Sequence, residues 1–182
     1  IGYRNLGTAA FAVDAHSGEP YFSQLSCSIQ AEHPVTEAVT GLDLVAMQLR
    51  IAAGHRLDLA QEDVRFAGHA IECRLNAEDP AHGYAPTPGR LSLFSVPERD
   101  GLRVDTHCRP GATVPPYYDP LLAKLIAHAG DRDQASDILL DALEDLDVEG
   151  VETNRTLLIS VLGHPDFRAG RATTDWLERA IR

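Results

Sequence analysis

The sequence has few cysteines, the residues that stabilise small secreted proteins through disulfides and small metal-bound domains through zinc. Its 182 residues include three cysteines, Cys27, Cys73 and Cys108, an odd number without zinc-type spacing. A chain of this length can bury a core without disulfides. We therefore expect reduced thiols in a cytoplasmic protein. The histidines also lack the i, i+4 spacing of a helical metal site, so no metal site is expected among them.

Basic residues and long apolar runs are scarce too. The chain has 16 Lys and Arg against 27 Asp and Glu, a formal net charge of -11. This argues against a nucleic-acid partner, because phosphate backbones demand a basic surface. No apolar run approaches the roughly 20 residues that span a bilayer, and the first residues lack the pattern of a signal peptide. We expect no membrane partner, and we interpret the glycosylation triplet at Asn154 as a chance match.

Residues 7–14 and 19–30 have the pattern of two strands joined by a turn at residues 16–18. Alternation along the second strand predicts one largely polar face that leads towards Glu32, and its members are Phe22, Gln24, Ser26, Ser28 and Gln30. A polar row of this kind is typical of a solvent-exposed face.

Helical spacing of apolar residues predicts a core-packed helix over residues 41–53. Further strands are predicted at 67–77, 90–95, 101–107 and 121–129. After Gly130, Asp131 and Gln134 are placed to cap a helix. The expected buried stripe of that helix is Ala135, Ile138, Leu139, Ala142, Leu143 and Leu146.

Two more helices are predicted at residues 154–162 and 174–181, the second anchored by Trp176 and Ile181. Helices covering one side of antiparallel strands make an α+β fold. We predict a division into residues 1–62 and 63–182.

Several blocks of the sequence closely resemble the biotin carboxylase family. Residues 30–37 read QAEHPVTE and residues 40–44 read TGLDL, as in that family's signature. Further matching blocks are QLRIAAG at residues 48–54, GHAIECRLNAEDP at 68–80 and VPPYYD at 114–119. Together with Pro88-Gly89 and Thr153-Asn154, these blocks extend over nearly the whole chain.

The resemblance implies a fold and an activity. It implies that residues 1–62 are the C-terminal part of an ATP-grasp domain and residues 63–182 the C-terminal subdomain of a biotin carboxylase. In that family the enzyme uses ATP, Mg or Mn and bicarbonate to carboxylate biotin. The biotin is carried on a biotin carboxyl carrier protein or domain, and a carboxyltransferase uses the product, for example in an acetyl-CoA carboxylase of fatty acid biosynthesis.

The resemblance also implies roles for single residues. Glu32 matches the general base that takes the proton of bicarbonate, and Arg74 matches the arginine that stabilises negative charge developing on biotin. Gln30 and the backbone at Ala31 match the bicarbonate-binding row, and Arg103 matches a dimer-interface arginine. Read from the residues alone, without the resemblance, a structural ion pair between Glu32 and Arg74 is favoured over a catalytic role.

The second predicted strand departs from the family pattern. Ala10 and Gln24 occupy the positions of metal-binding glutamates, so the sequence predicts no metal ligands there. Magnesium prefers anionic oxygen, which neither residue supplies. Ser26 replaces an asparagine, and Ser28 replaces an arginine whose charged planar fork would hold bicarbonate.

These departures predict a fragment or altered form of a biotin carboxylase that is inactive alone and binds no cofactor by itself. The alteration could be natural, as in a silent paralogue, or designed to make the exposed strands less prone to aggregation. One alternative is a non-catalytic dimerisation or interaction module, with a homodimer as its product. Another is a minimal binder of bicarbonate or biotin that uses Gln30, Glu32 and Arg74.

Overall fold

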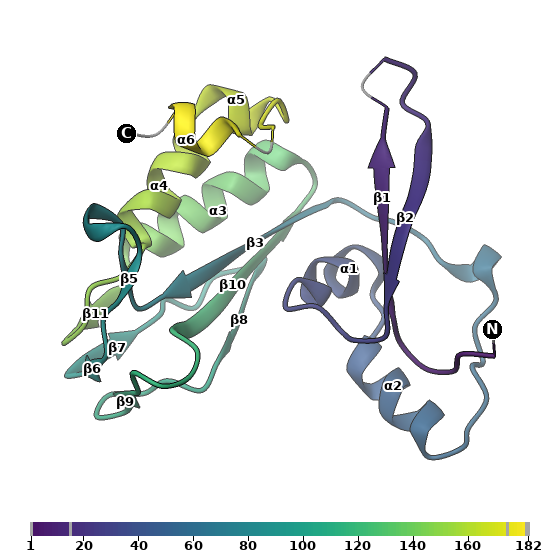
Figure 1. Ribbon diagram of the computed structural model, residues 1–182, viewed down its shortest axis with the longest axis horizontal. Helices are drawn as coiled ribbons and strands as arrows, with labels where there is room; N and C mark the ends of the chain where they lie inside the picture. Colours follow the sequence, from purple (N-terminus) through teal and green to yellow (C-terminus); the bar gives the residue numbers. More distant parts are fainter. Residues whose placement is uncertain (1, 15, 174, 181–182) are drawn as a thin grey trace. The chain divides into compact units, whose positions relative to one another are not determined.

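A computed structural model describes residues 2–14, 16–173 and 175–180. It divides into two compact units, Ile1–Phe66 and Ala67–Arg182, in each of which helices accompany antiparallel strands (Figure 1). The predicted α+β class is confirmed. The domain boundary expected between residues 62 and 63 stays a prediction.

The first unit begins with an antiparallel hairpin of β1 (Thr8–Val13) and β2 (Pro20–Ser26). The connecting turn is held by Asp14, whose side chain accepts hydrogen bonds from the backbone N–H groups of His16 at 3.0 Å and Ser17 at 2.7 Å. Gly18 has a φ of 73°, a left-handed conformation that glycine adopts at little cost. The predicted hairpin and its turn are therefore present.

A β-bulge divides this hairpin into two parts. Ala10 pairs with Gln24, but Phe11 pairs with Phe22, so Ser23 is an extra residue on β2. Cross-strand partners share a face, and the bulge therefore brings Phe22 to the same side as Phe11. Their rings meet edge to face with centroids 5.9 Å apart.

The bulge corrects the polar row predicted for the second strand. Strict alternation assigned Phe22 to the same face as Gln24, whereas the extra residue moves it to the other face. The strand also ends at Ser26, so Ser28 and Gln30 lie beyond it. A one-residue insertion shifts every later side chain to the opposite face, which alternation in one strand cannot reveal.

Two short helices follow, α1 (His33–Thr40) and α2 (Leu44–Ala52). The carboxylate of Glu37 on α1 accepts a hydrogen bond of 2.8 Å from the backbone N–H of Leu44, so it joins the two helices. Asp43 caps α2 by accepting from the N–H of Ala46 at 2.8 Å. The helix predicted over residues 41–53 is thus confirmed in its later part, while α1 was not predicted.

The first unit buries very little. No residue of α2 is buried, so the prediction of a core-packed helix is wrong for this chain. Among its described residues only Pro34 and Glu37 are buried. The large apolar side chains that remain exposed are Tyr3, Phe11, Val13, Tyr21, Phe22, Leu25, Val45, Leu49, Leu57 and Phe66. A short 3-10 turn, η1 (Gln61–Asp63), lies near the end of the unit.

The second unit is built on a three-stranded antiparallel sheet. Its strands are β3 (His69–Asn76), β10 (Leu121–Ala129) and β8 (Leu102–Thr106), with β10 in the centre. These strands confirm three of the predicted runs to within two residues. Their inner face carries Cys73, Leu125 and Val104 side by side and belongs to the core.

Helices α3 (Arg132–Glu144) and α4 (Arg155–Gly163) lie against one face of this sheet (Figure 1). Asp131 accepts from the N–H of Gln134 at 2.9 Å, so the predicted cap is confirmed. Of the predicted stripe, Ile138 is half-buried and the following are fully buried: Ala135, Leu139, Ala142, Leu143 and Leu146.

Two short helices complete the described chain, α5 (Pro165–Arg168) and α6 (Trp176–Ala180). Trp176 is buried as predicted, α5 was not predicted, and Ile181 lies outside the described residues. None of the helices in the described part of the chain has the length and hydropathy of a membrane span.

The strand predicted over residues 90–95 is wrong, because two short strands occupy it. The backbone N–H of Leu91 donates to Ala112, whereas that of Ser92 donates to Glu149, so the pairing partner changes within one residue. The small elements around it are β4 (Glu78–Asp79) with β5 (Ala85–Pro86), β6 (Gly89–Arg90) with β9 (Thr113–Val114), β7 (Leu93–Ser95) with β11 (Asp147–Glu149), and η2 (Pro80–His82).

Candidate functional site

In the first unit, the predicted bicarbonate-binding residues precede α1. Gln30 and Ala31 lie in the loop after β2, and Glu32 is the N-cap residue of the helix. The exposed N–H groups at a helix start favour negative charge nearby. Glu32 is exposed, and its side chain is not the hydrogen-bonding cap of α1 within the described chain.

His33 fixes the shape of that loop. The backbone carbonyl of Gln30 accepts from the N–H of His33 at 3.2 Å and lies 2.9 Å from its ring Nδ1. Because a carbonyl only accepts hydrogen bonds, this contact places a proton on Nδ1. His33 is therefore used as a local brace. Among the described residues, no group of His, Cys, Asp and Glu is arranged to hold a metal ion.

Ala10 and Gln24 are direct cross-strand partners in the hairpin, and Thr8 and Ser26 are the next pair on the same face. This face therefore carries a methyl group, an amide and two hydroxyls. A magnesium ion bound by protein side chains ordinarily takes one or two carboxylates. These positions do not fit a metal nucleotide, and we derive no chemical step through one.

In the second unit, Arg74 is presented by β3, and a buried asparagine fixes that strand. The side-chain Nδ2 of Asn154 donates to the backbone carbonyl of Arg74 at 3.1 Å, and its Oδ1 accepts from the N–H of Asn76 at 3.0 Å. The N–H of Asn154 in turn donates to the carbonyl of Asn76 at 3.2 Å. Sequence reasoning missed this role, although Asn154 was noted in the glycosylation triplet. Its burial argues against glycosylation.

The face of the sheet that carries Arg74 is charged. Lys124 on β10 stands directly between Arg74 on β3 and Asp105 on β8. The Nζ of Lys124 lies 3.7 Å from an oxygen of Asp105, and the lysine is 9% exposed. A nearly buried cation needs such a partner, since an uncompensated charge is costly. Sequence reasoning missed Lys124, although a single lysine within the apolar run 121–129 could have marked it as a nearly buried, paired charge.

Arg103 belongs to the same face and binds Asp105 through two hydrogen bonds, at 2.8 Å from Nε and 2.9 Å from Nη2. This bidentate pair fixes the direction of the guanidinium. The structure therefore places Arg74, Lys124, Asp105 and Arg103 on one face. Glu32 belongs to the first unit and Arg74 to the second, so an ion pair between them stays a prediction.

Two of the three cysteines, Cys73 and Cys108, are poorly suited to nucleophilic chemistry. Burial, and to a lesser extent the charge of Glu72, raises the pKa of the Cys73 thiol to about 12. Burial also raises the pKa of Cys108. The reactive form of cysteine is the thiolate, which is disfavoured in both cases.

The comparisons with known proteins match both units. The family model described as "Biotin carboxylase C-terminal domain" matches residues 72–179, and that of the "Carbamoyl-phosphate synthase L chain, ATP binding domain" matches residues 1–60. The fold is that of the end of an ATP-grasp domain followed by a biotin carboxylase C-terminal subdomain. The chain belongs to the biotin carboxylase family.

Individual relatives agree. The 2-oxoglutarate carboxylase small subunit of Hydrogenobacter thermophilus is 47% identical over 178 residues, which are 98% of this chain and 38% of the relative. The solved biotin carboxylase domain of a thermophilic 2-oxoglutarate carboxylase bound to bicarbonate has a TM-score of 0.93 and 47% identity, over 97% of this chain and 40% of that one. The biotin carboxylase domain dimer of Hydrogenobacter thermophilus, solved with MgADP, ADP and bicarbonate, has a TM-score of 0.92 and 47% identity. The match covers 97% of this chain and 39% of that one. The chain thus spans about 40% of the length of these relatives.

Proposed function

We propose that this chain carries the C-terminal part of a biotin carboxylase, whose parent activity is ATP-dependent carboxylation of biotin with bicarbonate. In this proposal Glu32 is the base for bicarbonate, and Gln30 and the backbone of Ala31 bind the anion. Arg74 stabilises the negative charge that develops on biotin, as fixed donors do at reacting centres. The parent would act in the cytoplasm with ATP, Mg or Mn, a biotin carrier and a carboxyltransferase.

The single observation that supports the proposal is where each of these groups lies within its own unit. Residues 30–32 lead into α1, and Arg74 is held on β3 by Asn154, in a chain 47% identical to a domain solved with bicarbonate. We further propose that the chain is inactive alone, because the face of Ala10 and Gln24 has no carboxylate for a metal nucleotide.

The test is a carboxylation assay with ATP, bicarbonate and free biotin, run beside the Hydrogenobacter domain as a positive control. We expect no turnover above background from this chain. Manganese binding, followed by electron paramagnetic resonance, should be absent in the chain and should appear when Ala10→Glu and Gln24→Glu are combined. Each single substitution is the matched control and should bind much less. Biotin-dependent ATP turnover by the unmodified chain would contradict inactivity.

A second function is favoured by a separate observation. We propose a dimerisation module, because β8 is an edge strand that carries Arg103, and a relative of high structural similarity was solved as a dimer. Sedimentation over a concentration series should show self-association that Arg103→Glu weakens and that Arg109→Glu, a substitution at another exposed arginine, leaves unchanged. A monomer at the highest concentration would exclude this function.

A further inference from the structure

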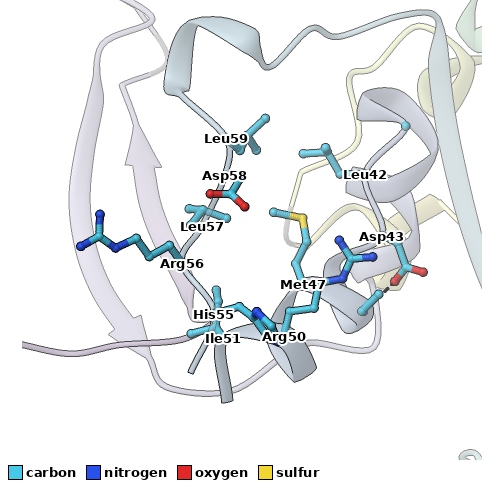
Figure 2. A pocket seen from close by; sticks show the side chains of 12 residues that line it. Leu42, Asp43, Met47, Arg50, Ile51, His55, Arg56, Leu57, Asp58 and Leu59 are labelled. Atoms are coloured by element: carbon cyan, nitrogen blue, oxygen red, sulfur yellow. Dashed lines mark hydrogen bonds between the residues drawn. The ribbon is translucent and has the colours of Figure 1, made fainter. Parts of the chain in front are cut away.

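A pocket of about 580 Å³ lies in the first unit between α2 and the segment that follows it (Figure 2). This volume falls within the roughly 300–1,000 Å³ of ordinary small-molecule sites. The pocket contains none of the residues assigned above to bicarbonate, biotin or metal. A ligand in this pocket would therefore not touch the residues assigned to carboxylation.

One part of the pocket is apolar. The side chains of Leu42 and Leu59 face each other across one end, and Met47 extends between them, as Figure 2 shows. Met47 is the single methionine of the chain. Its flexible, polarisable thioether can adapt to apolar groups of different shape. This end suits a branched or linear aliphatic group.

Charged side chains of both signs line the rest of the pocket, namely Asp43, Arg50, Arg56 and Asp58. The carboxylate of Asp43 already caps α2. The carboxylate of Asp58 points into the cavity from the segment after α2, and the side chain of Arg50 runs along the opposite wall (Figure 2). Across the ranges that the structure describes, neither Arg50 nor Asp58 makes a hydrogen bond or an ion pair through its side chain. Arg56 is directed away from the cavity.

This separation of charge selects among ligands. A simple anion would be attracted by Arg50 but repelled by Asp58. A simple cation would be attracted by Asp58 but repelled by Arg50. A molecule with both charges can satisfy both side chains at once, and an arginine binds a carboxylate through two parallel hydrogen bonds. An apolar molecule would desolvate both charges without replacing their hydrogen bonds to water.

We propose that this pocket binds a small zwitterion with an apolar body, an α-amino acid such as leucine. Its carboxylate would pair with Arg50, its ammonium group with Asp58, and its side chain would pack against Leu42, Met47 and Leu59. The site is open to solvent, so binding in the millimolar range is expected.

Titration calorimetry of the unmodified chain with L-leucine is the test, with 3-methylbutylamine and 4-methylpentanoate as analogues that each lack one charge. Leucine should bind saturably, and each analogue should bind at least about tenfold more weakly, a loss of about 1.4 kcal/mol. Analogues that bind as tightly as leucine, or no saturable leucine binding, would overturn the proposal.

Variants provide an independent check. Arg50→Gln and Asp58→Asn should each weaken leucine binding about tenfold or more. The matched controls Arg4→Gln and Glu62→Gln remove the same charges from exposed positions of the same unit outside the pocket and should change nothing. Equal losses in the controls would contradict the site. Circular dichroism establishes that each variant is folded, and the analogue series decides the matter if one is not.

Discussion

The side-chain amide of Asn154 donates a hydrogen bond of 3.1 Å to the backbone carbonyl of Arg74, across 80 positions of sequence. The same amide group accepts from the N–H of Asn76. It thereby ties the start of α4 to the strand that presents the candidate biotin-binding arginine. These hydrogen bonds of the Asn154 side chain go to backbone groups of Arg74 and Asn76, so Asn154 is a positioning residue.

Asn154→Ala should lower the free energy of unfolding by about 2 kcal/mol, because two part-buried hydrogen bonds are lost and their backbone partners are left unsatisfied. Chemical denaturation measures the change. Ser160→Ala, which removes an exposed hydroxyl from the same helix, is the control and should cost less than about 0.5 kcal/mol. Equal effects would show that Asn154 does not brace β3.

The hydrogen bond from Trp176 on α6 to Asp166 should weaken at acid pH. Hydrogen bonds from Arg171, and also from Trp176, hold the pKa of Asp166 below its usual value. A depressed pKa in the folded state means that this stabilisation is present above the ordinary aspartate pKa and is lost as the pH falls through the lower folded value.

Trp176 is the only tryptophan, so its fluorescence reports this step directly. Its emission should shift to longer wavelength as the pH falls below about 4. Asp166→Asn should show part of this shift at neutral pH and less dependence on acid. Asp100→Asn is the control and should follow the unmodified chain. An unchanged acid response in Asp166→Asn would show that Asp166 does not hold Trp176 in place.

The two units should differ in protection from hydrogen exchange. The first unit buries only Pro34 and Glu37 among its described residues, whereas β10 in the second is almost entirely buried. Amide exchange rates follow local opening, which costs little where few apolar contacts break. Mass spectrometry should find β1 and β2 exchanged within seconds and β10 exchanged last. Equal protection of both segments would contradict this reading.

A pair of glycines offers a matched test of close packing. A Cβ at Gly150 would collide with the carbonyl oxygen of Arg90, and its φ of 101° disfavours other residues. At Gly163, the last residue of α4, a Cβ meets nothing within 4 Å. Gly150→Ala should cost more than about 2 kcal/mol in unfolding free energy, whereas Gly163→Ala should gain up to about 1 kcal/mol. Thermal denaturation of both variants measures the difference.

Short sequence patterns were sufficient to predict several helices and strands of the second unit. The apolar run 121–129 predicted β10 with its bounds, since a strand buried on both faces needs no alternation. Asp131 and Gln134 predicted the start of α3, because capping depends on residues within one turn. The signature blocks indicated the family.

The tertiary structure decided the features that depend on distant partners. The bulge at Ser23 follows from pairing with β1, and the brace at Asn154 from the approach of α4 to β3. The exposure of α2 could not be read from its helical spacing, because an amphipathic pattern shows which face can be buried and not what covers it. Sequence determined the longer elements of the second unit and the family, because their signals are local. Register, burial and the Arg50–Asp58 pocket arose only when the folded chain brought separate segments together.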